Sequence, residues 1–192
     1  ARHDALEEIL ALGDEYPLQQ AYLVPWLWRW YAHHRRETGR GRSWWAPAYR
    51  LYRHLAIDYL FHALVRLMAV FARSGRVLRG FYRRCFPALM LTGTRCTDRV
   101  DRVLLMHHQV YRHVETELFV PESRLNEAMD LVRKALVYAA GQTDSLGDTH
   151  DQNVRQLGIS ESLGGIQGVY THHFPITLRR VLPDDTLISM AA

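Results

Sequence analysis

One stretch constrains the fold more than any other: the amphipathic run Ala48–Arg73. Pro47 precedes it, where proline favours the first turn of a helix, and Ser74–Gly75 interrupts it. Apolar residues recur in it at every fourth position, namely Leu51, Leu55, Tyr59, Ala63 and Leu67. Residues four apart share one face of a helix, so this run predicts a long helix with an apolar stripe.

Glycines, prolines and capping residues divide the rest of the chain in the same way. The further predicted helices are Asp4–Ala11, Leu18–Glu37 with a kink at Pro25, Arg76–Leu91, Arg99–Phe119 and Pro121–Ala140. After Gln142 the apolar periodicity fails, which predicts an irregular arm that lies across another protein surface. The fold class predicted from the sequence is therefore all-α.

Charge is distributed unevenly along the chain. Its formal net charge is +4, yet between Arg29 and Arg95 many arginines face only two acidic residues, Glu37 and Asp58. A basic surface attracts acidic partners, and guanidinium groups suit carboxylates and phosphates. Nucleic acid, an acidic protein and anionic lipid headgroups all remain open at this point. The uncharged stretches Tyr16–Trp28 and Ser162–Leu178 are broken by proline or glycine, which predicts no transmembrane span but leaves membrane-surface contact open.

Several groups of residues are candidate sites of chemistry. His54, Asp58 and His62 share a helix face, but no Glu-x-x-His partner accompanies them, so a polar stripe is favoured over a metal site. The other candidates are the histidines His107, His108, His113, His172 and His173, the acids Glu115 and Glu117, and the aromatic residues Trp26, Trp28, Trp30, Tyr31, Trp44 and Trp45. The histidines form no recognisable catalytic order, and the aromatic residues fit interface packing, nucleic-acid stacking or headgroup contact. Cys85 and Cys96 are interpreted as reduced thiols, and neither catalytic nor metal-binding residues are predicted.

A family resemblance rests on three segments. Leu51-Tyr52-Arg53 begins the long helix, Gly75–Arg84 is a basic segment with aromatic residues, and Thr97–Leu105 is followed by Glu115-Thr116-Glu117. These segments resemble the LYR-motif (complex 1 LYR) family over residues 47–120, and most closely the LYR accessory subunit on the matrix arm of respiratory complex I.

That resemblance implies an antiparallel three-helix bundle that binds an acyl carrier protein. The implied layout is a helical N-terminal extension (1–46), the bundle (47–120), an additional helix (121–141) and the irregular C-terminal arm (142–192). The carrier would bind Arg50, Tyr52, Arg53, Arg76, Arg79, Arg83 and Arg84, and its acyl chain would lie against Leu51, Leu55 and Tyr59. The chain would hold no cofactor of its own, because the acylated phosphopantetheine belongs to the carrier.

The function predicted from this resemblance is a structural, non-catalytic accessory subunit of mitochondrial NADH:ubiquinone oxidoreductase (complex I). It would lie on the matrix side of the inner membrane among other subunits of that complex, and Ala1 in place of Met fits a processed chain. Two alternatives stay open: an LYR-type assembly factor or subunit of another mitochondrial complex, and an RNA-binding protein of the mitochondrial ribosome.

Overall fold

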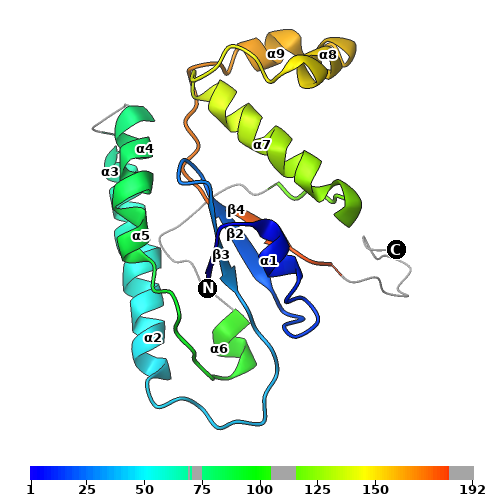
Figure 1. Cartoon of the computed structure of the whole chain (residues 1–192). Coiled ribbons are helices and arrows are strands. Elements are labelled where there is room, and N and C mark those ends of the chain that lie inside the picture. Colours follow the sequence, from blue (N-terminus) through cyan, green and yellow to red (C-terminus); the bar gives the residue numbers. More distant parts are fainter. Residues whose placement is uncertain (69, 71–74, 105–115, 182–192) are drawn as a thin grey trace. The chain divides into compact units, whose positions relative to one another are not determined.

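The computed structural model describes residues 1–68, 70, 75–104 and 116–181 (Figure 1). Backbone contacts divide the chain into two compact units. The first comprises Ala1–Glu115 with Pro175–Ala192, and the second comprises Thr116–Phe174. Residues 175–181 therefore belong to the same unit as residues 1–68, although the second unit separates them along the chain.

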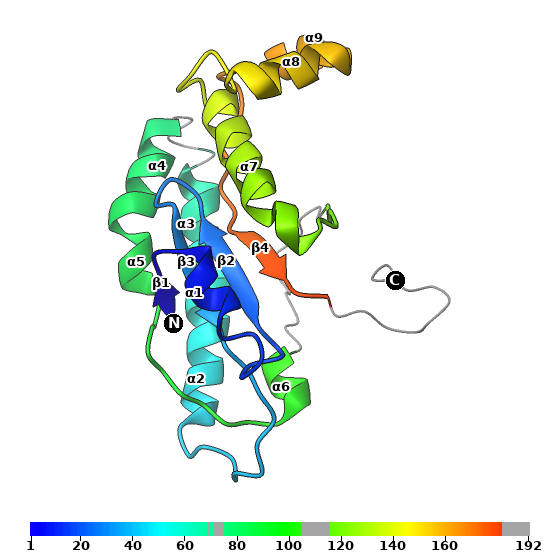
Figure 2. The same ribbon diagram turned by 45° about the vertical axis from the view of Figure 1, so that its right-hand side comes forward.

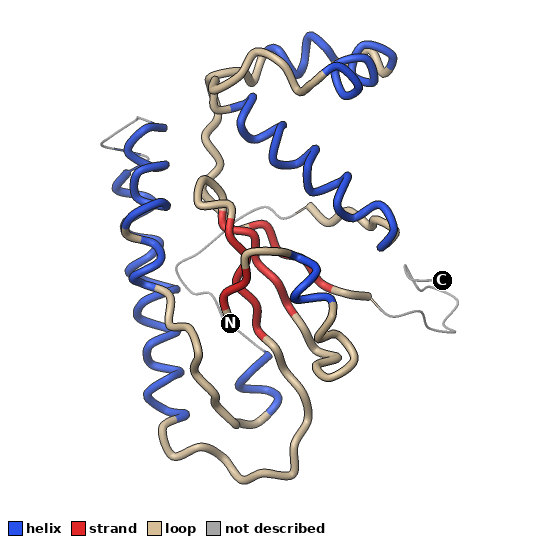
Figure 3. Tube along the Cα trace, in the orientation of Figure 1, coloured by secondary structure: helices blue, strands red, loops and turns tan. Residues whose placement is uncertain are grey.

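The first unit is built on an antiparallel sheet, which Figure 3 shows in red. Its strands are β1 (Arg2–His3), β2 (Gln20–Val24), β3 (Arg29–His33) and β4 (Ile176–Arg179), in the order β1-β3-β2-β4. β2 pairs with β3 as a hairpin and with β4 from the distant end of the chain. The prediction of an all-α fold was therefore wrong, since residues 1–46 hold three strands of a mixed α/β fold.

The hairpin occupies the segment for which a kinked helix, Leu18–Glu37, was predicted. Ala21 and Leu23 are buried while Gln20 and Tyr22 are half-buried, an alternation typical of a strand. Aromatic side chains also suit a pleated surface better than a helix. Pro25 marks the turn between two strands, where the sequence was read as a kink.

Helices cover both faces of this sheet (Figures 1 and 2). α1 (Leu6–Leu10) lies on one side and buries Leu6 and Ile9. On the other side runs the predicted long helix, which comprises α2 (Ala46–Tyr52), the π-helical segment η1 (Arg53–Phe61) and α3 (His62–Leu67). α4 (Gly75–Arg84) and α5 (Phe86–Leu89) run beside it, and α6 (Val100–Leu104) is a short helix further along the chain.

Aromatic rings join the helices to the sheet. Phe86 lies 5.6 Å from Phe61, 5.3 Å from Tyr82 and 6.1 Å from Tyr31 of β3, measured between ring centroids. All four side chains are buried. Edge-to-face and stacked pairs at these separations add to the free energy of burial, so this aromatic core fixes the long helix and α5 against the sheet.

The tip of the hairpin is held from α4. Trp26 and Trp28 have φ angles of 68° and 54°, which non-glycine residues rarely adopt. Trp26 is only 2% exposed, the Arg83 Nε donates a hydrogen bond to its carbonyl oxygen at 3.2 Å, and the Arg79 guanidinium lies 5.8 Å from its ring centroid. These contacts offset the cost of the strained turn.

The second unit is helical. It contains the short 3-10 segment η3 (Glu122–Arg124), α7 (Leu125–Ala139), α8 (Asp148–Gln156) and α9 (Ser160–Gly164). α7 fills the range of the predicted additional helix, whereas α8, α9 and β4 lie within the range predicted to be irregular. α8 is polar along its length, so apolar periodicity gave no sign of it. Within the described residues, no helix has both the length and the apolar character needed to span a membrane.

Candidate functional site

One face of the sheet carries polar side chains beside the long helix. Directly paired residues of antiparallel strands share a face, and Gln20 pairs with His33 and with Arg179, while Tyr22 pairs with Thr177. Arg35 follows β3, and Arg53 projects from the start of η1. We call Gln20, Tyr22, His33, Arg35 and Arg53 the polar cluster; Thr177 and Arg179 form its exposed rim.

Arg35 is the centre of this polar cluster. Its Nη2 donates a hydrogen bond to His33 Nδ1 at 2.8 Å, and its Nη1 donates to Gln20 Oε1 at 3.2 Å. A further hydrogen bond joins its guanidinium to the Tyr22 hydroxyl. Because a guanidinium can only donate, His33 Nδ1 must accept, which leaves the ring proton on Nε2. Arg35 therefore fixes the tautomer of His33 and the position of three neighbours.

The surroundings keep the uncharged members of the polar cluster neutral. Burial, followed by the charges of Arg35 and Arg53, lowers the pKa of His33 to about 3. Burial raises the pKa of the Tyr22 hydroxyl, although Arg35, Arg53 and Arg179 oppose that shift. At neutral pH the polar cluster therefore combines a neutral imidazole and a neutral phenol with cationic arginines. Such a site favours an electron-rich oxygen over a cation.

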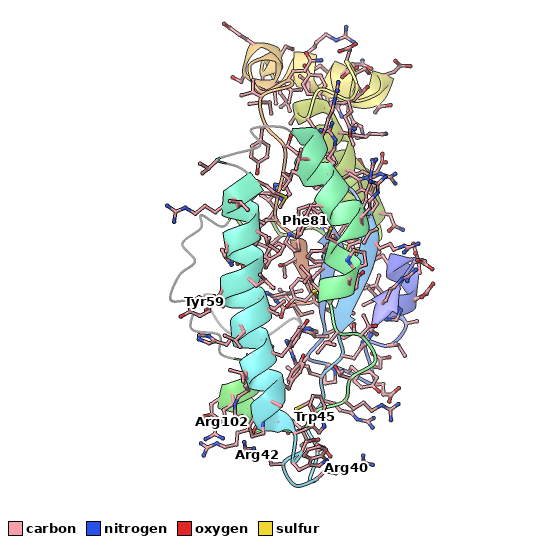
Figure 4. All side chains as sticks on the ribbon, turned by 90° about the vertical axis from the view of Figure 1, so that its left-hand side faces the viewer. Arg40, Arg42, Trp45, Tyr59, Phe81 and Arg102 are labelled. Atoms are coloured by element: carbon pink, nitrogen blue, oxygen red, sulfur yellow. The ribbon has the colours of Figure 1, made fainter. Side chains whose placement is uncertain are left out.

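A second charged group lies at the end where the long helix begins. The Asp98 carboxylate is 3% exposed and pairs with Arg50, and its Oδ1 lies 3.4 Å from Arg42 Nε. Burial raises the pKa of this carboxyl, but the backbone N–H of Arg99 and the charges of Arg50 and Arg42 outweigh it and lower the pKa. Figure 4 shows Arg40, Arg42 and Trp45 gathered at this end, with Arg102 of α6 nearby.

The residues of the LYR tripeptide make contacts within the chain or lie on its surface. The Tyr52 hydroxyl donates to the Leu89 carbonyl at 2.6 Å and accepts from the Leu91 N–H at 3.1 Å, and Arg53 Nη1 donates to the Val103 carbonyl at 3.3 Å. Leu51 is 57% exposed.

The other residues assigned to the carrier are spread over two helices. Arg76 and Arg84 are exposed, while Arg79 and Arg83 contact Trp26 as described above. Leu55 is exposed like Leu51, and Tyr59 projects from the long helix on the side away from α4 (Figure 4).

The predicted polar stripe of His54, Asp58 and His62 is partly buried, because Asp58 is 1% exposed. His54 Nδ1 lies 3.6 Å from Asp58 Oδ2, and His62 Nδ1 lies 3.2 Å from the Ile57 carbonyl oxygen. Within the described ranges, no group of three or more His, Cys, Asp or Glu side chains is arranged to hold a metal ion. The candidates His107, His108, His113 and Glu115 lie outside the described residues.

In the second unit, His172 Nδ1 lies 2.7 Å from the Tyr170 hydroxyl oxygen. Burial, followed by the charge of His173, lowers the pKa of His172 to about 4. Tyr170 and His172 lie in the predicted irregular arm, for which the sequence predicted no catalytic arrangement. The contact between them joins residues only two positions apart in the chain.

Sequence reasoning missed most of the polar cluster. Gln20, Tyr22, His33 and Arg35 fall in the segment that was read as one helix, and a helix scatters them over different faces. The available signal was the alternation of side-chain character along residues 20–24, which is typical of a strand.

Comparison with known proteins gives one relationship. No protein-family model matches the chain, and no solved structure matches it. A curated protein of an uncultured marine euryarchaeote, named "Long-chain alcohol oxidase", is 42% identical over 187 residues. The match covers 97% of this chain and 39% of that relative, so the chain spans well under half of the relative's length.

This relationship overturns the functional prediction made from the sequence. A near-complete match to a protein named as an oxidase is contrary to a non-catalytic accessory subunit of complex I, and to the two alternatives kept beside it. It also removes the basis for acylated phosphopantetheine as the associated cofactor, since an oxidase needs a redox group. The LYR resemblance, the acyl carrier partner and the mitochondrial location stay predictions.

Proposed function

We propose that this chain acts in the oxidation of long-chain alcohols, as a part of an oxidase that binds the substrate's hydroxyl group. The observation that carries the proposal is the 42% identity over 97% of the chain to a protein named "Long-chain alcohol oxidase". Because the match covers 39% of that relative, the chain corresponds to one part of such an enzyme.

The chemistry of the polar cluster supports this role. Oxidation of an alcohol to an aldehyde removes a proton from the hydroxyl and a hydride from the adjacent carbon, and negative charge develops on the oxygen as the proton leaves. Tyr22 and the Nε2–H of His33 offer neutral hydrogen-bonding groups. Arg35 and Arg53 supply positive charge near that oxygen, and fixed charges of this kind stabilise a developing oxyanion.

The hydride requires an acceptor such as a flavin. The residues of this chain do not fit a dinucleotide site of the Rossmann kind: the sequence contains no G-x-G-x-x-G, and every strand pairing in the described residues is antiparallel. The hydride acceptor therefore belongs to another part of such an oxidase. The role proposed for this chain is confined to the alcohol's oxygen and its proton.

Binding of a long-chain alcohol tests the proposal directly. Calorimetry with dodecanol and with dodecane separates recognition of the hydroxyl from recognition of the tail. Tyr22→Phe removes one hydroxyl partner and keeps the ring, so we expect dodecanol affinity to fall about three- to tenfold, the value of one neutral hydrogen bond. Tyr138→Phe, on α7 of the second unit, is the matched control and should leave binding unchanged. Equal affinity for dodecanol and dodecane, or an unaffected Tyr22→Phe variant, would contradict the proposal.

A further inference from the structure

The long helix presents apolar side chains to solvent along its outer face. Leu51 is 57% exposed, Leu55 52%, Tyr59 38% and Leu67 52%. These four residues, here called the outer stripe, recur at multiples of four positions and so lie along one face. The opposite face buries Asp58, Phe61 and Val65. A helix on a protein surface ordinarily turns its polar face to water, so this arrangement marks an interaction surface.

Basic and aromatic groups accompany the outer stripe. Arg66 is exposed next to Leu67, and the loop before α2 carries Arg40, Arg42 and Trp44, of which Trp44 is 92% exposed. Figure 4 shows that Arg40 and Arg42 lie where the long helix begins, near Arg102 of α6. Exposed tryptophan suits the boundary between water and lipid, and arginine suits lipid phosphates.

The carboxylates at this end leave a net positive charge. Asp98 is 3% exposed and pairs with two guanidinium groups, those of Arg50 and Arg42, so one of these two positive charges remains. Asp101 pairs with Arg99, and Arg40 adds a further positive charge. The surface offered to a partner thus combines an apolar line with cationic groups, which is the pattern of helices that lie in the plane of an anionic membrane surface.

We propose that the outer stripe docks this chain on an anionic lipid membrane, with its leucines in the acyl boundary and its arginines among the headgroups. A convex helix face does not enclose a single alkyl chain, whereas a bilayer surface covers its whole length. Apolar chains gain favourable free energy with each methylene that enters a bilayer, so long-chain alcohols concentrate there. Membrane docking goes beyond the proposed function, and the exposed stripe and the arginines that support it do not depend on the oxidase role.

Flotation with vesicles tests the docking of the full 192-residue chain. One set of vesicles contains phosphatidylcholine alone, and the other contains phosphatidylcholine with phosphatidylglycerol. The test variant is Leu51→Ser/Leu55→Ser/Leu67→Ser, and the matched control is Leu157→Ser/Ile159→Ser/Val169→Ser, which alters exposed apolar residues of the second unit. Circular dichroism checks that all the chains are folded, as expected for changes at exposed positions.

We expect wild type and control to bind the anionic vesicles, more weakly at high salt. The stripe variant should bind about a thousandfold more weakly, from roughly tenfold for each of its three leucines. Arg40→Glu/Arg66→Glu should also bind more weakly and keep the fold. Several results would overturn the proposal: no binding by wild type, equal salt-independent binding to both vesicles, or stripe and control variants that bind alike. A wild-type dimer that the stripe variant converts to a monomer would overturn it too, since a second copy would then be the occupant. Dodecanol binding is measured separately, so failure here leaves the proposed function standing.

Discussion

At the scale of single residues, His33 shows how burial and neighbouring charge determine what the polar cluster can do. A neutral imidazole beside Arg35 accepts a hydrogen bond at Nδ1 and keeps a proton at Nε2. A protonated imidazole there would turn an Nδ1–H toward the Arg35 guanidinium, which is itself a donor, and would place a positive charge beside those of Arg35 and Arg53. Its pKa of about 3 makes it a poor base at neutral pH, so we assign it a hydrogen-bonding role.

The lowered pKa of His33 predicts a pH dependence of stability. The unfolded chain binds a proton at His33 near pH 6.5, and the folded chain does so only near pH 3. Between these values the unfolded state holds more protons, so the contribution of His33 is complete above pH 6.5 and is lost as the pH falls toward 3. The loss is at most about 1.4 kcal/mol per pH unit.

Urea unfolding of wild type and His33→Asn across this range measures that contribution as a difference, which removes the parts due to His34 and His172. The difference in unfolding free energy should narrow as the solution becomes more acidic. A difference that stays constant with pH would contradict the assigned pKa shift.

At the scale of elements, the hairpin and the long helix show what sequence patterns reveal. Spacing at every fourth residue predicted the long helix, because a helix is the element that aligns such positions. The same spacing does not indicate whether the apolar face packs against the rest of the chain or is exposed. The buried face is the one with Phe61 and Val65, where the rings of α4 and α5 pack, and the outer stripe is exposed.

The sheet was harder to predict for a physical reason. Most of its stabilising contacts join distant parts of the chain, such as Leu23 with Ile176 across β2 and β4. No local pattern contains that pairing. Within the hairpin, a turn without glycine and with positive φ at Trp26 and Trp28 departs from the usual turn chemistry, so Pro25 was the one local signal of the turn itself.

Trp26 tests how far the hairpin tip stabilises the first unit. Trp26→Ala removes a fully buried ring and its contact with Arg79, so we expect a loss of about 3–5 kcal/mol in unfolding free energy. Trp44→Ala changes a side chain that is 92% exposed and should alter stability by no more than about 0.5 kcal/mol. Chemical denaturation followed by circular dichroism compares the two variants. Similar losses from both would show that the tip is not held as described.

At the scale of the whole molecule, the two units divide the chain in a way that the sequence did not indicate. β4 follows the second unit along the chain but belongs to the sheet of the first. It brings Thr177 and Arg179 to the rim of the polar cluster. The candidate site is thus assembled from both ends of the chain, and it needs the intervening segment to return β4 to the sheet.

Oxidation of a long-chain alcohol tests the central claim most directly. The protein is isolated under mild conditions from cells that make it, together with the other parts of the oxidase that hold the hydride acceptor, and is given dodecanol or ethanol in air. The account predicts that dodecanol yields dodecanal and hydrogen peroxide in equal amounts, with little product from ethanol, and that Tyr22→Phe slows the reaction while Tyr138→Phe does not. A preparation that oxidises no alcohol and carries an acylated carrier protein would contradict it.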